Sequence, residues 1–496
     1  MKNQIFCLIF LIILSGCSMN KNQSAKIEID ASQIIHTMKG GMGASWHAIS
    51  KEIPLNNEKY EFKAREVCPR GSGYGGNPPV TDTLKWQQIE NHAAWLGLNF
   101  IRVELSQRMY EPERDKFDWE NEEMQALYRI LNWCEKNGAD VFLQQMWGYV
   151  EWNAYPGVHP LISAPKNLDD FAGGIATLLE YLTKTKGYTC IKYFCMTNEP
   201  PGGPWGYWWE FGHETGSIND AWKRLKEEFD ARGINVPISG PDWTSMPPLE
   251  EEKLVFAPYL GSFDIHSYDG VTAEGESNLK KWADWAHAQN KPFFMSEFGN
   301  MKLGWGTDNV GPKTFEAALS NANDVIRALR AGTDGVNRWS FTNRGDLDGQ
   351  WQLIQTFDRE KKEYLDKITP EKEAYYGFGI ISRFLSKYSS TVSCITNQPD
   401  SALMSLALLS PAGELSIFVI NKSEKEQEIC LNITHFEKTL NIYQVSKEIL
   451  KKPEFELNPS LDFDPENAGE IVLPGKSITT LTSYTLKNSD AGIILQ

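Results

Sequence analysis

The chain has 496 residues, which exceeds the usual size of one domain and predicts one large and one smaller domain. Hydrophobic residues make up 41% of the sequence and charged residues 23%, which excludes a disordered chain and a protein with many membrane spans. The formal net charge of -16 at pH 7 repels phosphate backbones and argues against nucleic acid as a partner.

The first predicted element is a targeting segment over residues 1–17. Lys2 precedes an apolar run over 5–14, which is too short to span a membrane comfortably and is typical of a signal peptide. The run ends in Leu-Ser-Gly-Cys at 14–17, which resembles a bacterial lipobox, where the cysteine is lipidated and becomes the first mature residue. We expect Cys17 to carry the lipid; an ordinary signal peptide with a chance cysteine is the alternative.

A polar tether over 18–25 follows the cysteine. No later stretch has the length and apolar character of a membrane span, so we expect the mature chain to be anchored to the bacterial cell envelope without crossing a membrane. No acidic run follows Cys17, which favours the inner side of an outer membrane. A surface-facing position stays open.

Between about 40 and 345 one pattern repeats: an amphipathic helix ends at Gly or Asn, and a strand rich in Val, Ile and Phe follows within a few residues. There are seven such units, and the helix of the fifth is a looser stretch that ends at Gly261. The other predicted helices are 83–97, 122–138, 169–187, 218–233, 277–290 and 315–332. The predicted strands are 98–105, 139–148, 188–200, 234–243, 262–270, 291–299 and 333–343.

An eighth strand over 40–47 precedes the first helix, and eight strands that alternate with helices predict a (β/α)8 barrel over 40–380. The competing fold, an open doubly wound sheet, needs a glycine-rich phosphate turn after its first strand. Gly-Gly-Met-Gly-Ala-Ser at 40–45 lacks the required spacing, and Gly-Ser-Gly-Tyr-Gly-Gly at 71–76 follows no strand. The long loop over 48–82 lies at the carboxyl end of the first strand, where barrels build their sites.

From 381 to 496 the sequence changes to short alternating runs separated by turns, which predict a small antiparallel β-sandwich. The segment 26–39 is also β-like and lies outside the barrel, so we expect it to add an N-terminal strand to the sandwich. No exposed aromatic stripe stands out in this domain, which favours a structural accessory to the barrel over a carbohydrate-binding module. Cys394 and Cys430 could pair in an oxidising compartment, and unpaired buried thiols are the open alternative.

Two carboxylates stand at the ends of predicted barrel strands. Glu199, in Met-Thr-Asn-Glu-Pro, closes the fourth strand, and Glu297, in Met-Ser-Glu-Phe-Gly, closes the seventh. Because the carboxyl ends of all strands meet at one face of a barrel, both side chains belong to one site. Hydrolysis of a glycoside with retention needs two carboxyl groups about 5–5.5 Å apart, one as acid and one as nucleophile. The pair therefore predicts a glycoside hydrolase, in which Asn198 offers an amide to a sugar hydroxyl.

Asn-Glu-Pro after the fourth strand, together with a glutamate that ends the seventh, resembles clan A of the glycoside hydrolases over roughly 40–345. The N-terminal strand, the sandwich and the phrase Tyr-Tyr-Gly-Phe-Gly-Ile-Ile-Ser-Arg-Phe-Leu at 375–385 look most similar to families 30 and 39, and Ser-Glu-Phe-Gly is equally similar to family 5. The resemblance implies a retaining barrel enzyme that acts on β-linked glycans by double displacement without a cofactor. Glu199 is then the acid/base and Glu297 the nucleophile.

The resemblance also implies roles for four further residues at strand ends. Arg102 ends the second strand, where the clan has an arginine that supports the nucleophile; an ordinary strand-end salt bridge is the alternative. Tyr268 ends the sixth strand, where a tyrosine hydroxyl of the clan binds the nucleophile. His266 is expected near the acid/base, although a packed core histidine stays open. Trp339 ends the eighth strand, where the clan places an aromatic floor beneath the sugar.

Other ring side chains near strand ends are further candidates for sugar binding. Trp46 and His47 follow the first strand, and Trp147 follows the third. Trp205 opens the cluster Trp-Gly-Tyr-Trp-Trp over 205–209, in the loop directly after Asn-Glu-Pro. We expect this cluster to stack on sugar rings; a loop that packs its own aromatic residues is the alternative.

Two other functions compete with this one. A metal-dependent barrel hydrolase needs clustered histidine and acidic ligands, but the sequence has 8 histidines and neither His-x-His nor His-Glu-x-x-His, so we predict no metal. A surface lipoprotein that binds glycans on an inactive barrel usually lacks a catalytic carboxylate, whereas Glu199 and Glu297 are both present. The sugar, the linkage and endo or exo action depend on loop shapes that the sequence does not define.

Overall fold

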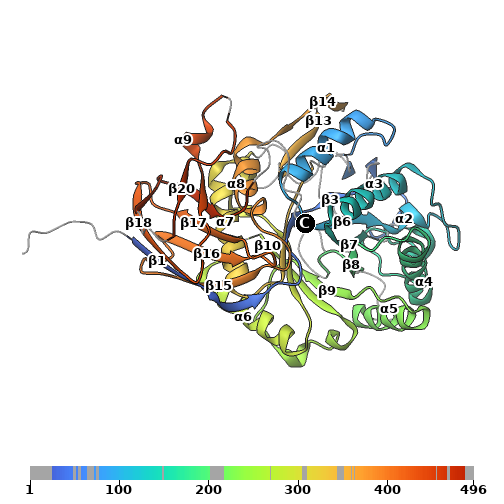
Figure 1. The fold of residues 1–496 in the computed structure, drawn as a ribbon. Helices are drawn as coiled ribbons and strands as arrows, with labels where there is room; N and C mark the ends of the chain where they lie inside the picture. The colour runs from blue at the N-terminus through green and yellow to red at the C-terminus, as the bar shows by residue number, and fades with distance from the viewer. Residues whose placement is uncertain are drawn as a thin grey trace, which may run out of the picture.

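The computed structural model describes residues 25–48, 52–53, 57–63, 72–73, 77–147, 150–200, 217–268, 270–303, 310–342, 351–358, 360–361, 363–453, 455–465 and 470–485. Within these ranges a barrel of parallel strands ringed by helices lies beside a domain built from a β-sheet (Figure 1). None of the helices in these ranges has the length and apolar character needed to span a membrane. The targeting segment with Cys17 lies outside the described residues.

Eight parallel strands close the barrel, which confirms the predicted (β/α)8 fold. The first strand is split at Ser45 into β2 (Met42–Ala44), which pairs with β12 (Gly335–Arg338), and β3 (Trp46–His47), which pairs with β6 (Phe100–Ser106). The split strand therefore joins the two ends of the sheet. The other strands are β6 (Phe100–Ser106), β7 (Asp140–Trp147), β8 (Ile191–Cys195), β9 (Ile238–Trp243), β10 (Ser262–Ser267), β11 (Phe293–Phe298) and β12 (Gly335–Arg338).

The barrel helices begin and end where the sequence supplies caps. The Asn121 side chain accepts a hydrogen bond from the backbone of the first turn of α3 (Glu122–Asn137), and Gly138 ends that helix with φ 66°. Ser217 and Gly233 do the same for α5. The helices are α1 (Thr83–Trp95), α3 (Glu122–Asn137), α4 (Leu168–Glu180), α5 (Ile218–Arg232), α6 (Ala273–Ala288), α7 (Phe315–Arg330) and α8 (Lys372–Ser382), with short α2 (Gln107–Tyr110) and α9 (Lys447–Leu450).

Two segments differ from the prediction. Between β9 and β10 the expected loose helix is replaced by two 3-10 turns, Glu251–Lys253 and Ala257–Tyr259. Prolines at 247, 248 and 258 remove backbone donors there, which explains why no α-helix forms. Between β12 and α8 a hairpin of β13 (Ile354–Asp358) and β14 (Glu363–Pro370) was not predicted; it lies against α1.

Aromatic side chains fill the amino-terminal end of the barrel. The ring centroids of Phe100 and Phe294 lie 4.9 Å apart, and those of Tyr193 and Phe294 lie 4.7 Å apart. Phe142 completes this layer. This aromatic layer closes the barrel interior at its amino-terminal end, and barrel enzymes build their active sites at the carboxyl-terminal end.

The second domain is one sheet of nine strands, in the order β20-β19-β22-β17-β16-β15-β1-β18-β21. The N-terminal strand joins it as predicted: it runs antiparallel to β15 and parallel to β18. The thiols of Cys394 and Cys430 are both free. The strands are β1 (Ala25–Thr37), β15 (Ser390–Thr396), β16 (Leu403–Leu409), β17 (Leu415–Asn421), β18 (Gln427–Thr434), β19 (Leu440–Ser446), β20 (Leu461–Phe463), β21 (Glu470–Leu473) and β22 (Ser477–Thr482).

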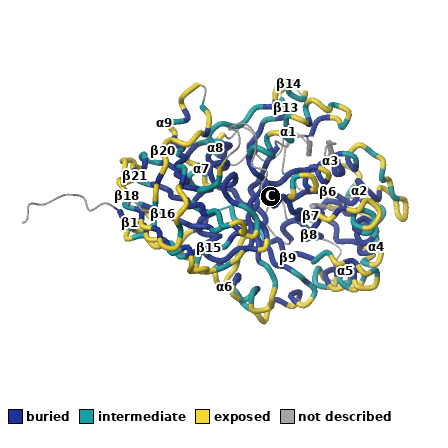
Figure 2. Tube along the Cα trace, viewed as in Figure 1, coloured by how far each residue is buried: buried dark blue, intermediate teal, exposed yellow. Residues whose placement is uncertain are grey.

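Alternate residues of one strand serve two cores. Every residue of β17 is buried, but Ile417 and Val419 face the interior of the sheet domain, whereas Phe418 and Ile420 join the core that the barrel helices also form. This follows from the two-residue period of a strand. Figure 2 shows buried segments in dark blue in both the barrel and the sheet domain. The sheet domain is therefore packed firmly on α7 and α8.

Candidate active site

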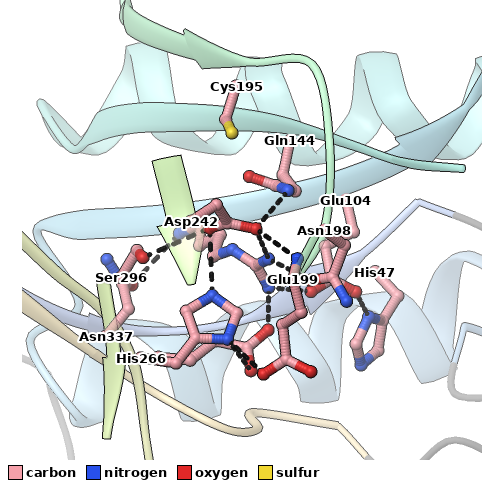
Figure 3. Close-up of polar contacts among 12 residues, drawn as sticks. His47, Glu104, Gln144, Cys195, Asn198, Glu199, Asp242, His266, Ser296 and Asn337 are labelled. Atoms are coloured by element: carbon pink, nitrogen blue, oxygen red, sulfur yellow. Dashed lines mark hydrogen bonds and ion pairs between the residues drawn. The ribbon is translucent and has the colours of Figure 1, made fainter. Parts of the chain in front are cut away.

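Glu199 and Glu297 converge at the carboxyl end of the barrel. Figure 3 shows Glu199 beside the ring of His266. Glu297 lies in β11, the seventh strand, and Glu199 follows β8, the fourth. Their exposed fractions are only 4% and 3%. Glu199 has φ 50°, a left-handed conformation that residues other than glycine rarely adopt, and its N–H donates to Asp242 Oδ2 at 3.2 Å. One oxygen of each glutamate and a ring nitrogen of His266 lie within 4.8 Å of one another.

His266, at the end of β10, lies between the two glutamates. Its Nδ1 is 2.6 Å from Glu199 Oε1 and 3.2 Å from Glu297 Oε2, and its Nε2 is 3.0 Å from Asp242 Oδ1. Burial alone would lower the pKa of His266, but the negative charges of Glu297 and Asp242 outweigh it and raise that pKa well above its ordinary value. The ring is therefore an imidazolium that can donate to carboxylates on both sides.

Glu297 is surrounded by donors. Arg102 Nη1 donates to its Oε1, and the Tyr268 hydroxyl donates to its Oε2 at 2.6 Å. Burial raises the pKa of Glu297 to about 7, although the positive charges of Arg102 and His266 oppose that rise. The carboxylate is thus held in one orientation by three separate groups.

Arg102 organises this end of the barrel from β6. Beyond its bond to Glu297, it donates to Glu104 through Nη1 and to Asn198 Oδ1 through Nη2 at 2.8 Å. Burial would lower the pKa of Arg102, but Glu297, Glu104 and Asp242 raise it, so the guanidinium stays charged. Positive charges of Arg102 and His266 therefore lie beside the carboxylates of Glu199 and Glu297, an arrangement that suits proton transfer at these two groups.

The family model described as "Cellulase (glycosyl hydrolase family 5)" matches residues 58–345, more than half of the chain. The chain belongs to this family. It is therefore a glycoside hydrolase of clan A, whose enzymes act with retention of configuration. No curated protein sequence is significantly similar to it.

Solved structures of glycoside hydrolases have the same fold. A family 30 subfamily 8 xylanase from Clostridium acetobutylicum matches with a TM-score of 0.60 and 14% identity, over 92% of this chain and 99% of the xylanase. A GH30 endoxylanase from Clostridium papyrosolvens C71 matches with a TM-score of 0.62 and 13% identity, over 93% and 100%. An endo-β1,6-glucanase matches with a TM-score of 0.62 and 14% identity, over 94% and 96%.

Two carboxyl groups below the glutamates of this glycoside hydrolase were not predicted. Asp242 accepts from His266 and, through Oδ2, from Gln144 Nε2 at 3.1 Å (Figure 3). Asp264 accepts from the hydroxyls of Ser239 and Ser296, both at 2.9 Å. Burial and the nearby charge of Asp242 raise the pKa of Asp264 well above its ordinary value, so its carboxyl is neutral. Burial would also raise the pKa of Asp242, but His266 and Arg102 lower it, so that carboxylate keeps its charge.

Glu104 is the other functional residue that sequence reasoning missed. It accepts from Arg102 on one oxygen and is hydrogen-bonded to His47 Nδ1 on the other. A signal was present, because Glu104 stands two residues after Arg102 and alternate residues of a strand share a face. The rings of His47 and Trp339 meet edge to face with centroids 5.0 Å apart, so both predicted residues lie beside the charged cluster.

The prediction for Trp46 is corrected. Its indole is 0% exposed and packs in the outer core against Trp86, Trp133 and Phe341, with its Nε1 donating to Asn77 Oδ1 at 3.1 Å. Neighbouring residues of a strand point to opposite faces, so His47 faces the site and Trp46 faces the helices. Sugar binding by Trp46 is therefore excluded.

Two predicted ligands stay untested. Trp147 is the last residue of β7, but its side chain lies outside the described residues, as do Trp205 and the rest of the loop over 201–216. Two buried clusters in the described ranges have enough donors for a metal, Glu199–His266–Glu297 and Cys195–Asp242–Asp264. The close contacts in the first cluster are hydrogen bonds of the His266 ring, 2.6 Å from Nδ1 to Glu199 Oε1 and 3.2 Å from Nδ1 to Glu297 Oε2.

Proposed function

We propose that this glycoside hydrolase cleaves a β-linked polysaccharide by double displacement, with Glu199 as acid/base and Glu297 as nucleophile. The observation that carries the proposal is the convergence of both carboxylates on His266, with oxygens within 4.8 Å of each other. Retaining glycosidases place the two carboxyl groups about 5–5.5 Å apart, whereas inverting enzymes need about 6.5–9.5 Å to admit a water molecule. The separation supports retention.

In the first step a Glu297 oxygen attacks the anomeric carbon, and the bond from that carbon to the leaving oxygen breaks. Glu199 gives its proton to the leaving oxygen, which departs as an alcohol. Arg102 and Tyr268 hold Glu297 for this attack. Because its pKa is about 7, the attacking carboxylate is charged in most molecules above neutral pH.

In the second step a water molecule attacks the anomeric carbon of the glycosyl ester, and Glu199 takes a proton from that water. The Glu297 carboxylate leaves, so the starting protonation is restored. While Glu297 is an ester it carries no charge, and the imidazolium of His266 then has Glu199 and Asp242 as its remaining charged partners. The Glu199 carboxylate that the first step leaves is the form that acts as base.

The substrate class is drawn from the comparisons. The structurally similar proteins include two xylanases and an endo-β1,6-glucanase, and the matching family model is described as cellulase. We therefore place β-linked xylan, β1,6-glucan and cellulose first in a panel of plant and microbial polysaccharides. Endo action predicts a ladder of oligosaccharides as the first products, and exo action predicts a single small sugar.

The test uses the unlipidated chain from Ser18 to Gln496 on that panel, with Glu297→Ala as control. Sugar release by the wild type alone supports the proposal. Release by neither protein, with retained binding to one polymer in a pull-down, would contradict it and support a lipoprotein that binds glycans on an inactive barrel.

We further propose that Cys17 anchors the enzyme to the cell envelope, on the strength of the apolar run and the Leu-Ser-Gly-Cys sequence before it. The wild type expressed in bacteria should incorporate radiolabelled palmitate, and Cys17→Ala should not. Equal labelling of both would contradict the anchor. Protease added to intact cells separates a surface-facing protein, which is digested, from one on the inner side of the outer membrane.

A further inference from the structure

A second cluster of histidine and carboxylate lies at the amino-terminal end of the barrel. His36 is near the end of β1, His287 is in the last turn of α6, and Asp334 directly precedes β12. His36 Nε2 is 3.2 Å from Asp334 Oδ1, and His287 Nε2 is 2.7 Å from Asp334 Oδ2. The two imidazole rings are stacked, with centroids 4.5 Å apart and planes inclined by 17°. Both rings therefore direct the same nitrogen to one carboxylate.

The three donor atoms have the spacing of metal ligands. All of them lie within 4.8 Å of one another, and the two nitrogen–oxygen distances are 3.2 and 2.7 Å. Two ligands bound about 2.1 Å from a tetrahedral zinc ion lie roughly 3.4 Å apart, so a shift of a few tenths of an ångström admits the ion. Two imidazoles and one carboxylate suit zinc and other divalent transition metals better than calcium or magnesium.

The surroundings also fit a cation. Asp334 is 0% exposed, and its oxygens accept hydrogen bonds from the backbone N–H groups of Lys39 and Phe293, both at 2.9 Å, which fix its orientation. The side chains of His36 and His287 are 19% and 30% exposed, so the site opens to solvent on one side. The carboxyl end of α6 contributes partial negative charge next to His287.

We propose that His36, His287 and Asp334 form a binding site for one divalent transition metal ion, with zinc as the preferred ion and solvent in the remaining coordination position. The three residues come from the sheet domain strand β1, from a barrel helix and from the start of a barrel strand. A metal bound there would link the segment between β1 and β2 to the amino-terminal end of the barrel. It would stabilise the folded chain, because a ligand that binds only the folded state shifts unfolding.

The proposal is tested by calorimetric titration of zinc chloride into the chain from Ser18 to Gln496, freed of any affinity tag and treated with a chelator. We expect one saturable site per chain and a rise in melting temperature with zinc. His36→Ala and His287→Ala should each weaken binding at least tenfold. Both side chains are partly exposed, so we expect both variants to fold, which circular dichroism checks.

Two controls separate this site from others. His435 forms a similar exposed pair with Asp30, with Nδ1 and Oδ1 2.8 Å apart, but it has only one imidazole; His435→Ala should keep the zinc affinity. Glu297→Ala, in the cluster at the other end of the barrel, should keep it too. No saturable binding, or equal affinity in the wild type and both His36→Ala and His287→Ala, would overturn the proposal and leave a hydrogen-bonded bridge only. Absorption bands of bound cobalt(II) that are lost in His287→Ala would identify the imidazole as a ligand.

Discussion

Two clusters of histidine and carboxylate occupy opposite ends of one barrel, and they have opposite compositions. At the carboxyl end one imidazole, that of His266, contacts both Glu199 and Glu297, and all three side chains are buried. At the amino end one carboxylate, that of Asp334, serves two partly exposed imidazoles. The first arrangement places two carboxylates on one buried imidazole, and the second places two partly exposed imidazoles on one carboxylate, a donor set that suits a transition metal ion. Both clusters contain imidazoles and carboxylates. The number of imidazoles per carboxylate and the burial of the side chains therefore decide whether a cluster suits proton transfer or metal binding.

Removal of the nucleophile should have the largest effect on the cluster at the carboxyl end. We expect Glu297→Ala to lower kcat by about 10⁴-fold or more, because the covalent glycosyl intermediate forms on this carboxylate. Turnover of the preferred polysaccharide measures the effect, and circular dichroism checks the fold. A variant with near wild-type activity would end the assignment of Glu297.

Removal of the acid/base should cost less. We expect Glu199→Ala to lower kcat/KM on the polysaccharide by about 10²–10⁴-fold, the usual contribution of general acid–base catalysis. A substrate with an activated aryl leaving group needs no protonation, so its turnover should be partly rescued by azide. The azide product should keep the configuration of the substrate; an inverted product would contradict double displacement.

The layer below the glutamates offers a matched pair of substitutions. Asp242→Asn removes the charge that holds His266 and should lower kcat/KM by about 10–100-fold, as loss of a supporting partner does elsewhere. Asp264→Asn replaces a carboxyl that is already neutral and should cost much less. If the Asp264 variant is the more damaged of the two, the assignment of charge in this layer is wrong.

The smallest expected effect is a shift in pH dependence. The nucleophile must be ionised, so kcat/KM should fall as the pH drops below the pKa of Glu297, which is about 7. The Tyr268 hydroxyl stabilises the charged form, so Tyr268→Phe should raise that pKa and move the acid limb upward by about one pH unit. A limb that stays in place or moves downward would contradict the role of Tyr268.

The sequence predicts the barrel and its two glutamates well, because strand order alone decides which carboxylates share a face. The sequence does not predict features that depend on the exact register of a strand. Trp46 and His47 are neighbours, and only the pairing of β3 with β6 shows which of them faces inward. The partners Glu104 and Asp242 are ordinary acidic residues in the sequence, and their function follows from burial beside Arg102 and His266.

The amino-terminal cluster was missed for a different reason. His36, His287 and Asp334 are distant in the chain and form no sequence motif, so the prediction of no metal rested on local spacing alone. They meet only because β1 crosses from the sheet domain to the barrel floor, next to the end of α6. The roles of Trp147 and Trp205 stay predictions.

The most direct test of the central claim is covalent labelling of the nucleophile. The wild type, incubated with an activated 2-deoxy-2-fluoro-β-glycoside of the sugar that it releases, is digested and its peptides are weighed by mass spectrometry. We predict a mass increase of one fluoroglycosyl unit on the peptide that contains Glu297, with activity lost in proportion to labelling. A label on another residue, or inactivation without a covalent label, would contradict the assignment of Glu297 as nucleophile.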